Sequence, residues 1–172
     1  KGTIGEVFHI EACMSGFHGP NNWWRDDKKI SGGAMFDWGA HIIDWILHFI
    51  PQTIVAVEGF NHKLVWFENK TNEDHAELVI RFENGSTAQV EISSIAAVSK
   101  PRWRILGTKG ALQMPSWDKL EGYGLIDGHV AKYLQWNVNA ADWRRLLRFL
   151  GPLPPLFTSD DVWLENARCL GW

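Results

Sequence analysis

The sequence predicts an α+β domain built on an open, predominantly antiparallel β-sheet with helices on one face. Residues 53–108 contain short stretches that alternate apolar and polar types and are rich in β-branched and aromatic residues, which indicates successive strands. Apolar residues follow a helical spacing over 34–50 and again over 130–150, which indicates a helix on each side of the strands. The dipeptide Asn84-Gly85 is typical of a tight hairpin turn, so its flanking strands should pair antiparallel.

Breaks in periodicity divide the first two thirds of the chain into elements. A Gly-rich entry leads into an opening strand over 2–12, and Gly, Pro and paired Asn make 13–30 a loop. Pro51 ends the helix over 34–50, because proline cannot donate the helical hydrogen bond. The strands that follow are expected at 53–60, 62–68, 75–83, 86–94 and 102–108.

The last third is less regular. Gly122, Gly124 and Gly128 interrupt any pattern, so residues 115–135 are expected to be irregular. The helix over 130–150 should end at Gly151-Pro152. A final helix should begin after Thr158 or Ser159, whose hydroxyls can cap its first turn.

Length and charge limit the class of protein. The 172 residues suffice for one domain with a substantial core. A net charge of −3 provides no field for nucleic acid, and the arginines at 102, 104 and 144–148 are interpreted as solvated faces. No stretch is apolar enough to span a membrane, the start is no signal peptide, and the two cysteines form no redox or metal spacing. We therefore expect a cytoplasmic protein that binds neither nucleic acid nor membrane.

The expected sheet has apolar residues on both sides in places. Leu78, Val79 and Ile80 are consecutive, so the sheet face away from the helices should carry apolar surface. Such a face favours self-association, and we expect a homodimer or homotetramer formed through it.

One short segment carries titratable residues at helical spacing. Asp37, His41 and Asp44 lie four and three residues apart and would share one helix face. Spacing alone leaves a functional site and a polar surface stripe both open, and it favours the stripe. Extension of the stripe to His48 raises a third possibility, a Zn²⁺ or Mn²⁺ site. However, about 10 Å of helix axis would separate His41 from His48, so no metal site is predicted.

The loop before this segment offers side chains suited to a polar substrate. Trp24 can stack on a sugar ring, Asn22 can bond hydroxyls, and Arg25 presents a planar guanidinium to a carboxylate or polyol. Alternatively, the tryptophans are packing residues and Arg25 pairs with Asp26 or Asp27. Residue type supports the two interpretations of this loop equally.

Residues 24–45, WRDDKKISGGAMFDWGAHIIDW, resemble the Gfo/Idh/MocA family of NAD(P)-dependent oxidoreductases. The similarity lies in the W-R-x-D loop, the Ser-Gly-Gly segment and the Asp-x-Gly-x-His-x-x-Asp helix, of which the last is the most specific. The stretches GTIG at 2–5, RFENGSTAQVEIS at 81–93, RILGTKGAL at 104–112 and PLFTSDDVWLENA at 155–167 extend the resemblance over nearly the whole chain.

The resemblance implies that residues 1–172 form a single C-terminal domain for substrate binding and oligomerisation. The N-terminal Rossmann domain, which would bind NAD or NADP, is then absent from the chain. The nearest approach to a Gly-x-Gly-x-x-Gly motif is Gly122-Tyr123-Gly124, whose third glycine is misplaced at 128. Lys100-Pro101 likewise does not match the family's catalytic Glu-Lys-Pro, so the fragment alone should be inactive.

The resemblance also implies roles for individual residues. His41 would be the general base, or part of a proton relay, in oxidising a secondary alcohol of a sugar or polyol. Asp37 would bind a substrate hydroxyl or orient His41. Asp44 would contribute to substrate binding, or it would hold the helix or the imidazole through a hydrogen bond. Gly39 would allow close approach of another backbone or of the cofactor ring. The alternative function is a non-catalytic binding or scaffold domain of the same fold, or, less favoured, a metal-binding domain.

Overall fold

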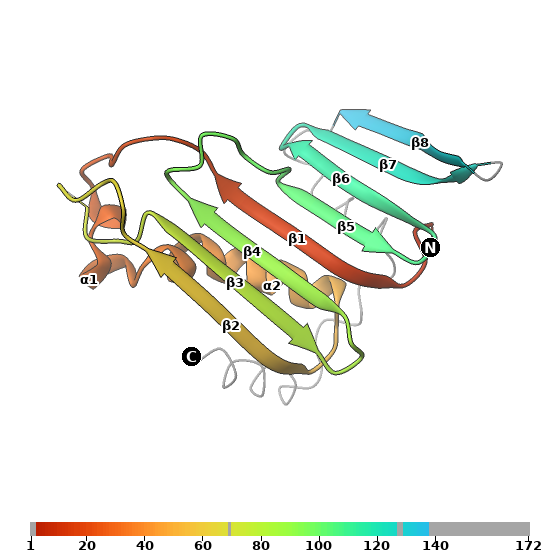
Figure 1. Cartoon of the computed structure of the whole chain (residues 1–172), viewed down its shortest axis with the longest axis horizontal. Coiled ribbons are helices and arrows are strands. Elements are labelled where there is room, and N and C mark those ends of the chain that lie inside the picture. Colours follow the sequence, from red (N-terminus) through yellow and green to blue (C-terminus); the bar gives the residue numbers. More distant parts are fainter. Residues whose placement is uncertain (1–2, 69, 127–128, 138–172) are drawn as a thin grey trace.

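The computed structural model describes residues 3–68, 70–126 and 129–137, which form one eight-stranded sheet with a helix across one face (Figure 1). The strands are β1 (Val7–Ser15), β2 (Ile54–His62), β3 (His75–Phe82), β4 (Thr87–Ser93), β5 (Trp103–Gly107), β6 (Gly110–Ser116), β7 (Lys119–Ile126) and β8 (His129–Asn137). The helical elements are a 3₁₀ turn (Trp24–Asp26), α1 (Lys28–Ser31), a π-helical turn (Met35–Gly39) and α2 (Ala40–Phe49). The predicted α+β class is confirmed.

β1 lies in the interior of the sheet although it comes first in the chain. The strand order is β2-β3-β4-β1-β5-β6-β7-β8. β1 pairs with β4 in parallel, with Ser15 opposite Ser93, and all other neighbouring strands are antiparallel. The predicted hairpin at Asn84-Gly85 joins β3 to β4, and Gly85 has the positive φ of 82° that this turn needs. Because β1 and β4 run in the same direction, their carboxyl ends lie at the same edge of the sheet.

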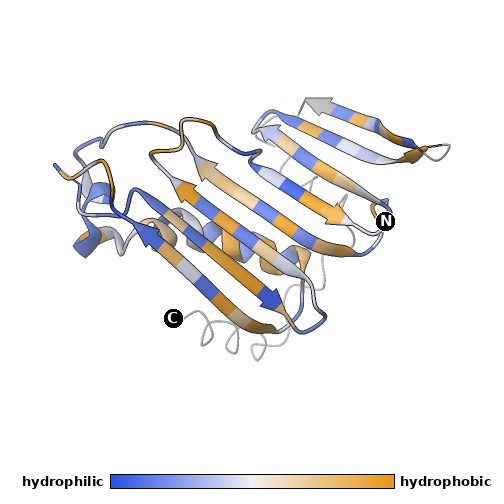
Figure 2. Ribbon diagram, viewed as in Figure 1, coloured by the Kyte–Doolittle hydropathy of each residue, from blue (hydrophilic) through white to orange (hydrophobic). Residues whose placement is uncertain are grey.

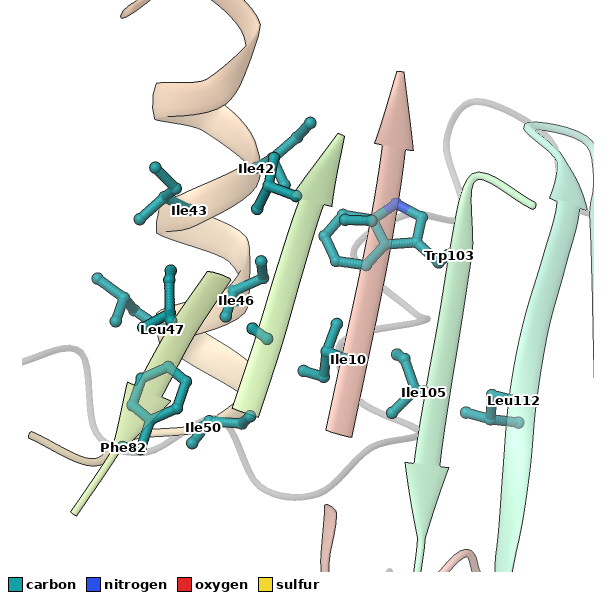
Figure 3. Packing of buried hydrophobic residues seen from close by; sticks show 14 of the residues in the cluster. Ile10, Ile42, Ile43, Ile46, Leu47, Ile50, Phe82, Trp103, Ile105 and Leu112 are labelled. Atoms are coloured by element: carbon teal, nitrogen blue, oxygen red, sulfur yellow. The ribbon is translucent and has the colours of Figure 1, made fainter. Parts of the chain in front are cut away.

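The core lies between α2 and the sheet face that it covers. Ile42, Ile43, Ile46 and Leu47 recur at helical spacing and are buried on the sheet side of α2 (Figure 3). They belong to one cluster with alternate residues of the strands beneath, among them Ile10, Ile80, Val90, Trp103, Ile105 and Leu112. The alternation is visible along the strands in Figure 2. In the described ranges, no helix has the length and apolar character needed to cross a bilayer.

The opposite sheet face is more polar than expected. Of the apolar run at 78–80, Leu78 and Ile80 pack toward the helix and only Val79, 40% exposed, faces away. Ion pairs occupy much of this face, namely Arg104 to Glu11, Lys100 to Glu91 and Lys132 to Glu121, and His75 lies 3.6 Å from Glu77. Successive side chains of a strand point to opposite faces of the sheet, so a run of three apolar residues cannot make one face apolar. Oligomerisation through this face stays a prediction.

The strand predicted at 62–68 is wrong. β2 continues to His62, and residues 63–74 then form a loop. The backbone amides of Leu64, Val65 and Trp66 donate to the side chain of Asp74 instead of to a neighbouring strand. A buried carboxylate therefore overrides the β propensity of this apolar stretch.

The irregular segment predicted at 115–135 is also wrong, since β6, β7 and β8 run through it. Gly122 and Gly124 lie within β7, where an added Cβ would come within 3.0–3.2 Å of the Tyr133 ring on β8. These glycines allow close approach of a side chain rather than breaking the strand. The helix predicted over 130–150 is wrong for 130–137, which belong to β8. Its remainder, and the final helix after Thr158 or Ser159, lie outside the described residues.

Ile46 tests the packing of α2 on the sheet, because its side chain is fully buried at the centre of the core. We expect Ile46→Ala to lower the free energy of unfolding by about 2–5 kcal/mol, through lost burial and the cavity left behind. Urea denaturation followed by tryptophan fluorescence measures the change. Ile30→Ala, at a side chain that is 65% exposed, is the control and should change stability by about 0.5 kcal/mol or less. Equal effects of the two substitutions would contradict this packing.

Candidate functional site

A cavity of about 470 Å³ opens at the sheet edge where β1 and β4 end. Its lining includes the ends of these strands and the residue after each of them, 14–16 and 92–94. The lining also includes Arg25 and Asp37, and Lys70 and Asp74 from the loop before β3. The volume is within the range of small-molecule sites, about 300–1,000 Å³.

An ion pair joins the loop at 20–27 to the helical segment. The Arg25 guanidinium donates to Asp37 Oδ2 at 2.9 Å, so Arg25 pairs with neither Asp26 nor Asp27. Its guanidinium carbon lies 5.2 Å from the Trp23 ring centroid and 4.8 Å from that of Trp24, within cation–π distance. The alternative for this loop is therefore wrong, because Arg25 pairs with Asp37 instead and Trp23 and Trp24 are 50% and 48% exposed rather than packed in the core. Arg25 lines the cavity, and its role in substrate binding stays a prediction.

The sequence around Arg25 explains why the loop turns there. Asp26 accepts hydrogen bonds from the backbone amides of Asn21 and Trp23, at 2.9 and 3.3 Å, and closes the 3₁₀ turn. Asp27 then caps α1 by accepting from the amide of Lys29. Asn22 adopts a positive φ of 56°, a conformation that asparagine tolerates better than most residues. Asn22 is exposed, whereas its neighbour Asn21 lines the cavity.

The segment 71–73 fastens this loop to the rest of the domain. The Asn72 amide donates to the carbonyl of Arg25 and, at 2.9 Å, to the hydroxyl of Ser31. Buried Glu73 accepts from the backbone amide of Ala34 at 2.9 Å and from Lys28 at 3.1 Å. Sequence analysis missed both residues, because their role depends on contacts with residues about 40 positions earlier.

The predicted trio of Asp37, His41 and Asp44 does not converge on one point. Asp37 lies in the π-helical turn and lines the cavity. His41 is exposed on α2 outside the cavity lining, with its ring 6.0 Å from Trp38 and 6.4 Å from Trp45. Asp44 is half-exposed and lies 3.8 Å from His48. Because a π turn takes up an extra residue, Asp37 is not one regular α-helical turn before His41.

Gly39 is buried where the π-helical turn meets α2. A Cβ at this position would lie 2.9 Å from the sulfur of Met35 and 3.5 Å from Ile92 of β4. The missing side chain thus leaves room for Met35, one turn earlier in the same helical segment. A cofactor contact at Gly39 stays a prediction.

A metal site finds no support in the positions of the predicted donors. Across residues 3–68, 70–126 and 129–137, no group of three or more His, Cys, Asp or Glu could hold an ion. The carboxylate of Asp37 is engaged by Arg25, and that of Asp44 approaches His48.

Asp74 is the most strongly held carboxylate at the cavity, and sequence analysis missed it. Its side chain is fully buried; Oδ2 accepts three backbone amides at 2.7–3.1 Å, and Oδ1 lies 3.1 Å from Lys63 Nζ. Burial raises the pKa of Asp74, but the hydrogen bonds from Val65, Leu64, Lys63 and Trp66 outweigh burial and lower this pKa to about 2. Asp74 is therefore ionised at neutral pH and fixes the loop at 63–74.

Comparison with known proteins assigns the fold to a family. Residues 1–113 match the model described as the GFO/IDH/MocA C-terminal domain. The chain belongs to this family. No curated protein matches the chain.

Solved structures of Gfo/Idh/MocA type share the fold of this domain. The match with an NAD-binding protein from Listeria innocua has 26% sequence identity and a TM-score of 0.69, and it covers 97% of this chain and 52% of the Listeria chain. The match with an NAD-binding oxidoreductase from Klebsiella pneumoniae has 22% identity and a TM-score of 0.62, and it covers 88% of this chain and 45% of the Klebsiella chain. The match with a levoglucosan dehydrogenase in complex with NADH and levoglucosan has 20% identity and a TM-score of 0.64, and it covers 81% of this chain and 42% of the dehydrogenase chain. The chain thus spans about half the length of the structures it matches.

The lowered pKa of Asp74 predicts an acid-sensitive GFO/IDH/MocA domain. A carboxyl whose pKa falls on folding, here from 3.8 to about 2, stabilises the fold above its unfolded pKa. This contribution, about 2 kcal/mol, should be lost as the pH falls through the interval between the two values. We expect Asp74→Asn to lower stability at pH 7 and to flatten the decline in stability between roughly pH 5 and pH 2. Urea denaturation at a series of pH values measures both, and an unchanged decline in the variant would contradict the assignment.

Proposed function

We propose that this domain is the substrate-binding half of an NAD(P)-dependent oxidoreductase that oxidises a secondary alcohol of a sugar or polyol. The observation that carries the proposal is the cavity lined by the Arg25–Asp37 ion pair and framed by tryptophans. A charged acceptor, amide donors and aromatic faces together suit a ligand with many hydroxyl groups. Levoglucosan, which one structural relative binds together with NADH, is a sugar derivative of this kind.

Removal of hydrogen from a secondary alcohol requires a hydride to leave carbon and a proton to leave oxygen. We assign acceptance of this proton to His41, because imidazole is the side chain that most often serves as a general base and the ring of His41 is exposed to solvent. Asp37, held by Arg25 at 2.9 Å, would accept a hydrogen bond from a substrate hydroxyl and fix its orientation. Trp24, Asn22 and Asp44 are proposed to contribute to binding from the rim.

NAD or NADP would be held mainly by a separate N-terminal Rossmann domain, and its nicotinamide would supply the hydride acceptor. The surface at the cavity fits such a neighbour, because Trp23, Trp24 and Trp38 remain 50%, 48% and 38% exposed. Aromatic faces left in water at a cavity rim are typical of a surface that another group covers. Trp38 and His41 would lie nearest to that group. Homo-oligomerisation through the sheet and a cytoplasmic location remain predictions.

The competing hypothesis is a binding or scaffold domain without chemistry, since a fold does not determine an activity. It predicts that sugars bind to the cavity but that substitution of His41 has no catalytic effect. The two hypotheses therefore differ in the consequence of one side chain.

The intact gene product provides the test. We expect it to reduce NAD⁺ or NADP⁺, followed at 340 nm, with at least one member of a panel of sugars and polyols. His41→Gln should lower kcat by about 100-fold or more, in line with loss of a general base. Asp37→Asn should lower kcat/KM by about 10- to 100-fold, through loss of a charge-assisted hydrogen bond.

His48→Gln is the matched control, because it makes the same change seven residues further along the same helix. It should leave kcat within about two-fold of the parent, a threshold of about 0.4 kcal/mol in barrier height. Reduction of neither cofactor with any panel member would refute the enzyme hypothesis. Substrate binding with unchanged turnover in His41→Gln would refute the role of His41.

A further inference from the structure

Lys70 is a buried cation at the cavity that the proposed reaction does not use. Its side chain is only 10% exposed, and it comes from the loop between β2 and β3. Its ammonium donates to Ser94 Oγ at 2.7 Å and lies 3.7 Å from Asp74 Oδ1, beyond hydrogen-bond distance. An ammonium has three N–H donors, so this arrangement leaves capacity for another acceptor.

Two lysines share the single negative charge of Asp74. Lys63 is the nearer, at 3.1 Å from Oδ1, and it also donates to the carbonyl of Trp66. The other oxygen of Asp74 is occupied by three backbone amides. Lys70 is therefore the cation in excess, and of the two lysines only Lys70 lines the cavity. Burial lowers the pKa of Lys70, and Asp74 opposes this effect.

Arg102 adds a second cation to the cavity lining. Its guanidinium donates at 3.4 and 3.3 Å to the carbonyls of Cys13 and Ser15, and it lies 5.9 Å from the Trp117 ring. These partners carry no charge, and within the part of the chain that the structure describes Arg102 forms no ion pair. Its positive charge is thus not neutralised by a carboxylate.

The carboxylates at the cavity are already engaged. Asp37 pairs with Arg25, Glu73 with Lys28, and Asp26 accepts two backbone amides. Asp74 in turn lies nearer to Lys63 than to Lys70. Although the lining holds four carboxylates and three cations, Lys70 and Arg102 are thus the two lining cations that no carboxylate has as its nearest partner.

We propose that the substrate carries a carboxylate in addition to its hydroxyl groups, as a sugar acid does, and that Lys70 binds this carboxylate. The inference rests on the proposed function and narrows its substrate class. A substrate carboxylate would give Lys70 an anionic acceptor of its own, and a buried ammonium gains more from an added anion than an exposed one does. Lys70 would act in binding and would take no part in proton transfer.

The test compares D-gluconate with D-sorbitol, which share a six-carbon polyol skeleton and differ in one terminal group. In the intact gene product, kcat/KM for cofactor reduction should favour gluconate. Lys70→Met should reduce the ratio of the two kcat/KM values by about 10- to 100-fold, chiefly by raising KM for gluconate. Because both substrates are measured on one preparation, the ratio does not depend on the fraction of protein that folds.

Lys63→Met is the matched control, since it removes the other cation that approaches Asp74 and Lys63 itself does not line the cavity. It should lower the melting temperature but preserve the ratio. Arg102→Gln provides a second variant at the cavity and should also reduce the ratio. Binding of both compounds, measured by calorimetry in the presence of NADH, provides a readout independent of turnover.

The possible outcomes separate the two proposals. Oxidation of sorbitol without preference for gluconate, or a preference that Lys70→Met preserves, overturns the carboxylate site and leaves the proposed function standing. An equal decrease in the ratio of the two kcat/KM values in Lys63→Met and Lys70→Met also overturns the carboxylate site, because both substitutions would then act through Asp74. If neither compound binds or reacts while another neutral polyol does, the carboxylate site is refuted; if no polyol or sugar acid reacts, the proposed function fails as well.

Discussion

The parallel pairing of β1 with β4 is the constraint on which the candidate site depends. A purely antiparallel sheet would place the carboxyl end of every second strand at the opposite edge, whereas Ser15 opposite Ser93 brings two carboxyl ends together. β3 and β5, the antiparallel neighbours on either side, begin at this edge. Residues just before each of them, Asp74 and Arg102, therefore also line the cavity. One strand pairing gathers parts of the chain that are 78 residues apart in sequence, as Ser15 and Ser93 are.

The candidate site also requires that the loops at this edge of the sheet keep one conformation, and buried hydrogen bonds restrain them. Asp74 accepts three consecutive amides, which shapes the loop that carries Lys70, and Asn72 and Glu73 next to it fasten the segment from Arg25 to Ala34. Each contact satisfies a backbone group that would otherwise be left without a partner on burial, at a cost of about 1–3 kcal/mol. Positioning of the ion pair of Arg25 and Asp37 thus depends on residues that do not themselves touch a ligand. The hydrogen bonds of Asn72, Glu73 and Asp74 therefore contribute both to the stability of the fold and to the geometry of the candidate site.

Sequence patterns predicted the parts of this domain whose structure is determined locally. The helix at 34–50 and the hairpin at Asn84-Gly85 depend on apolar spacing and turn chemistry, and both are present. β7 was missed because glycine is unfavourable in an isolated strand, while Gly122 and Gly124 are required there by the ring of Tyr133. Arg25 and Asp37 were predicted as site residues by type and motif, but not as partners. Lys70 and Asp74 escaped notice because the apolar stretch beside them resembles a strand, and only tertiary contacts reveal its loop.

If the two proposals hold, the groups around the cavity would order a ligand along one direction. Lys70 bonds to Ser94 at the sheet edge, Asp37 lies in the helical segment that bounds the cavity, and exposed His41 lies beyond the lining on α2. A ligand that spans these positions would have its anionic end in the buried part and its reacting hydroxyl toward the surface. That orientation suits chemistry shared between two domains, because the buried part fixes the substrate while the carbon that gives up hydride stays accessible to a cofactor held elsewhere. It also separates the specificity of the site from its reactivity: a change at Lys70 should alter which ligand is chosen, whereas a change at His41 should alter how fast it reacts.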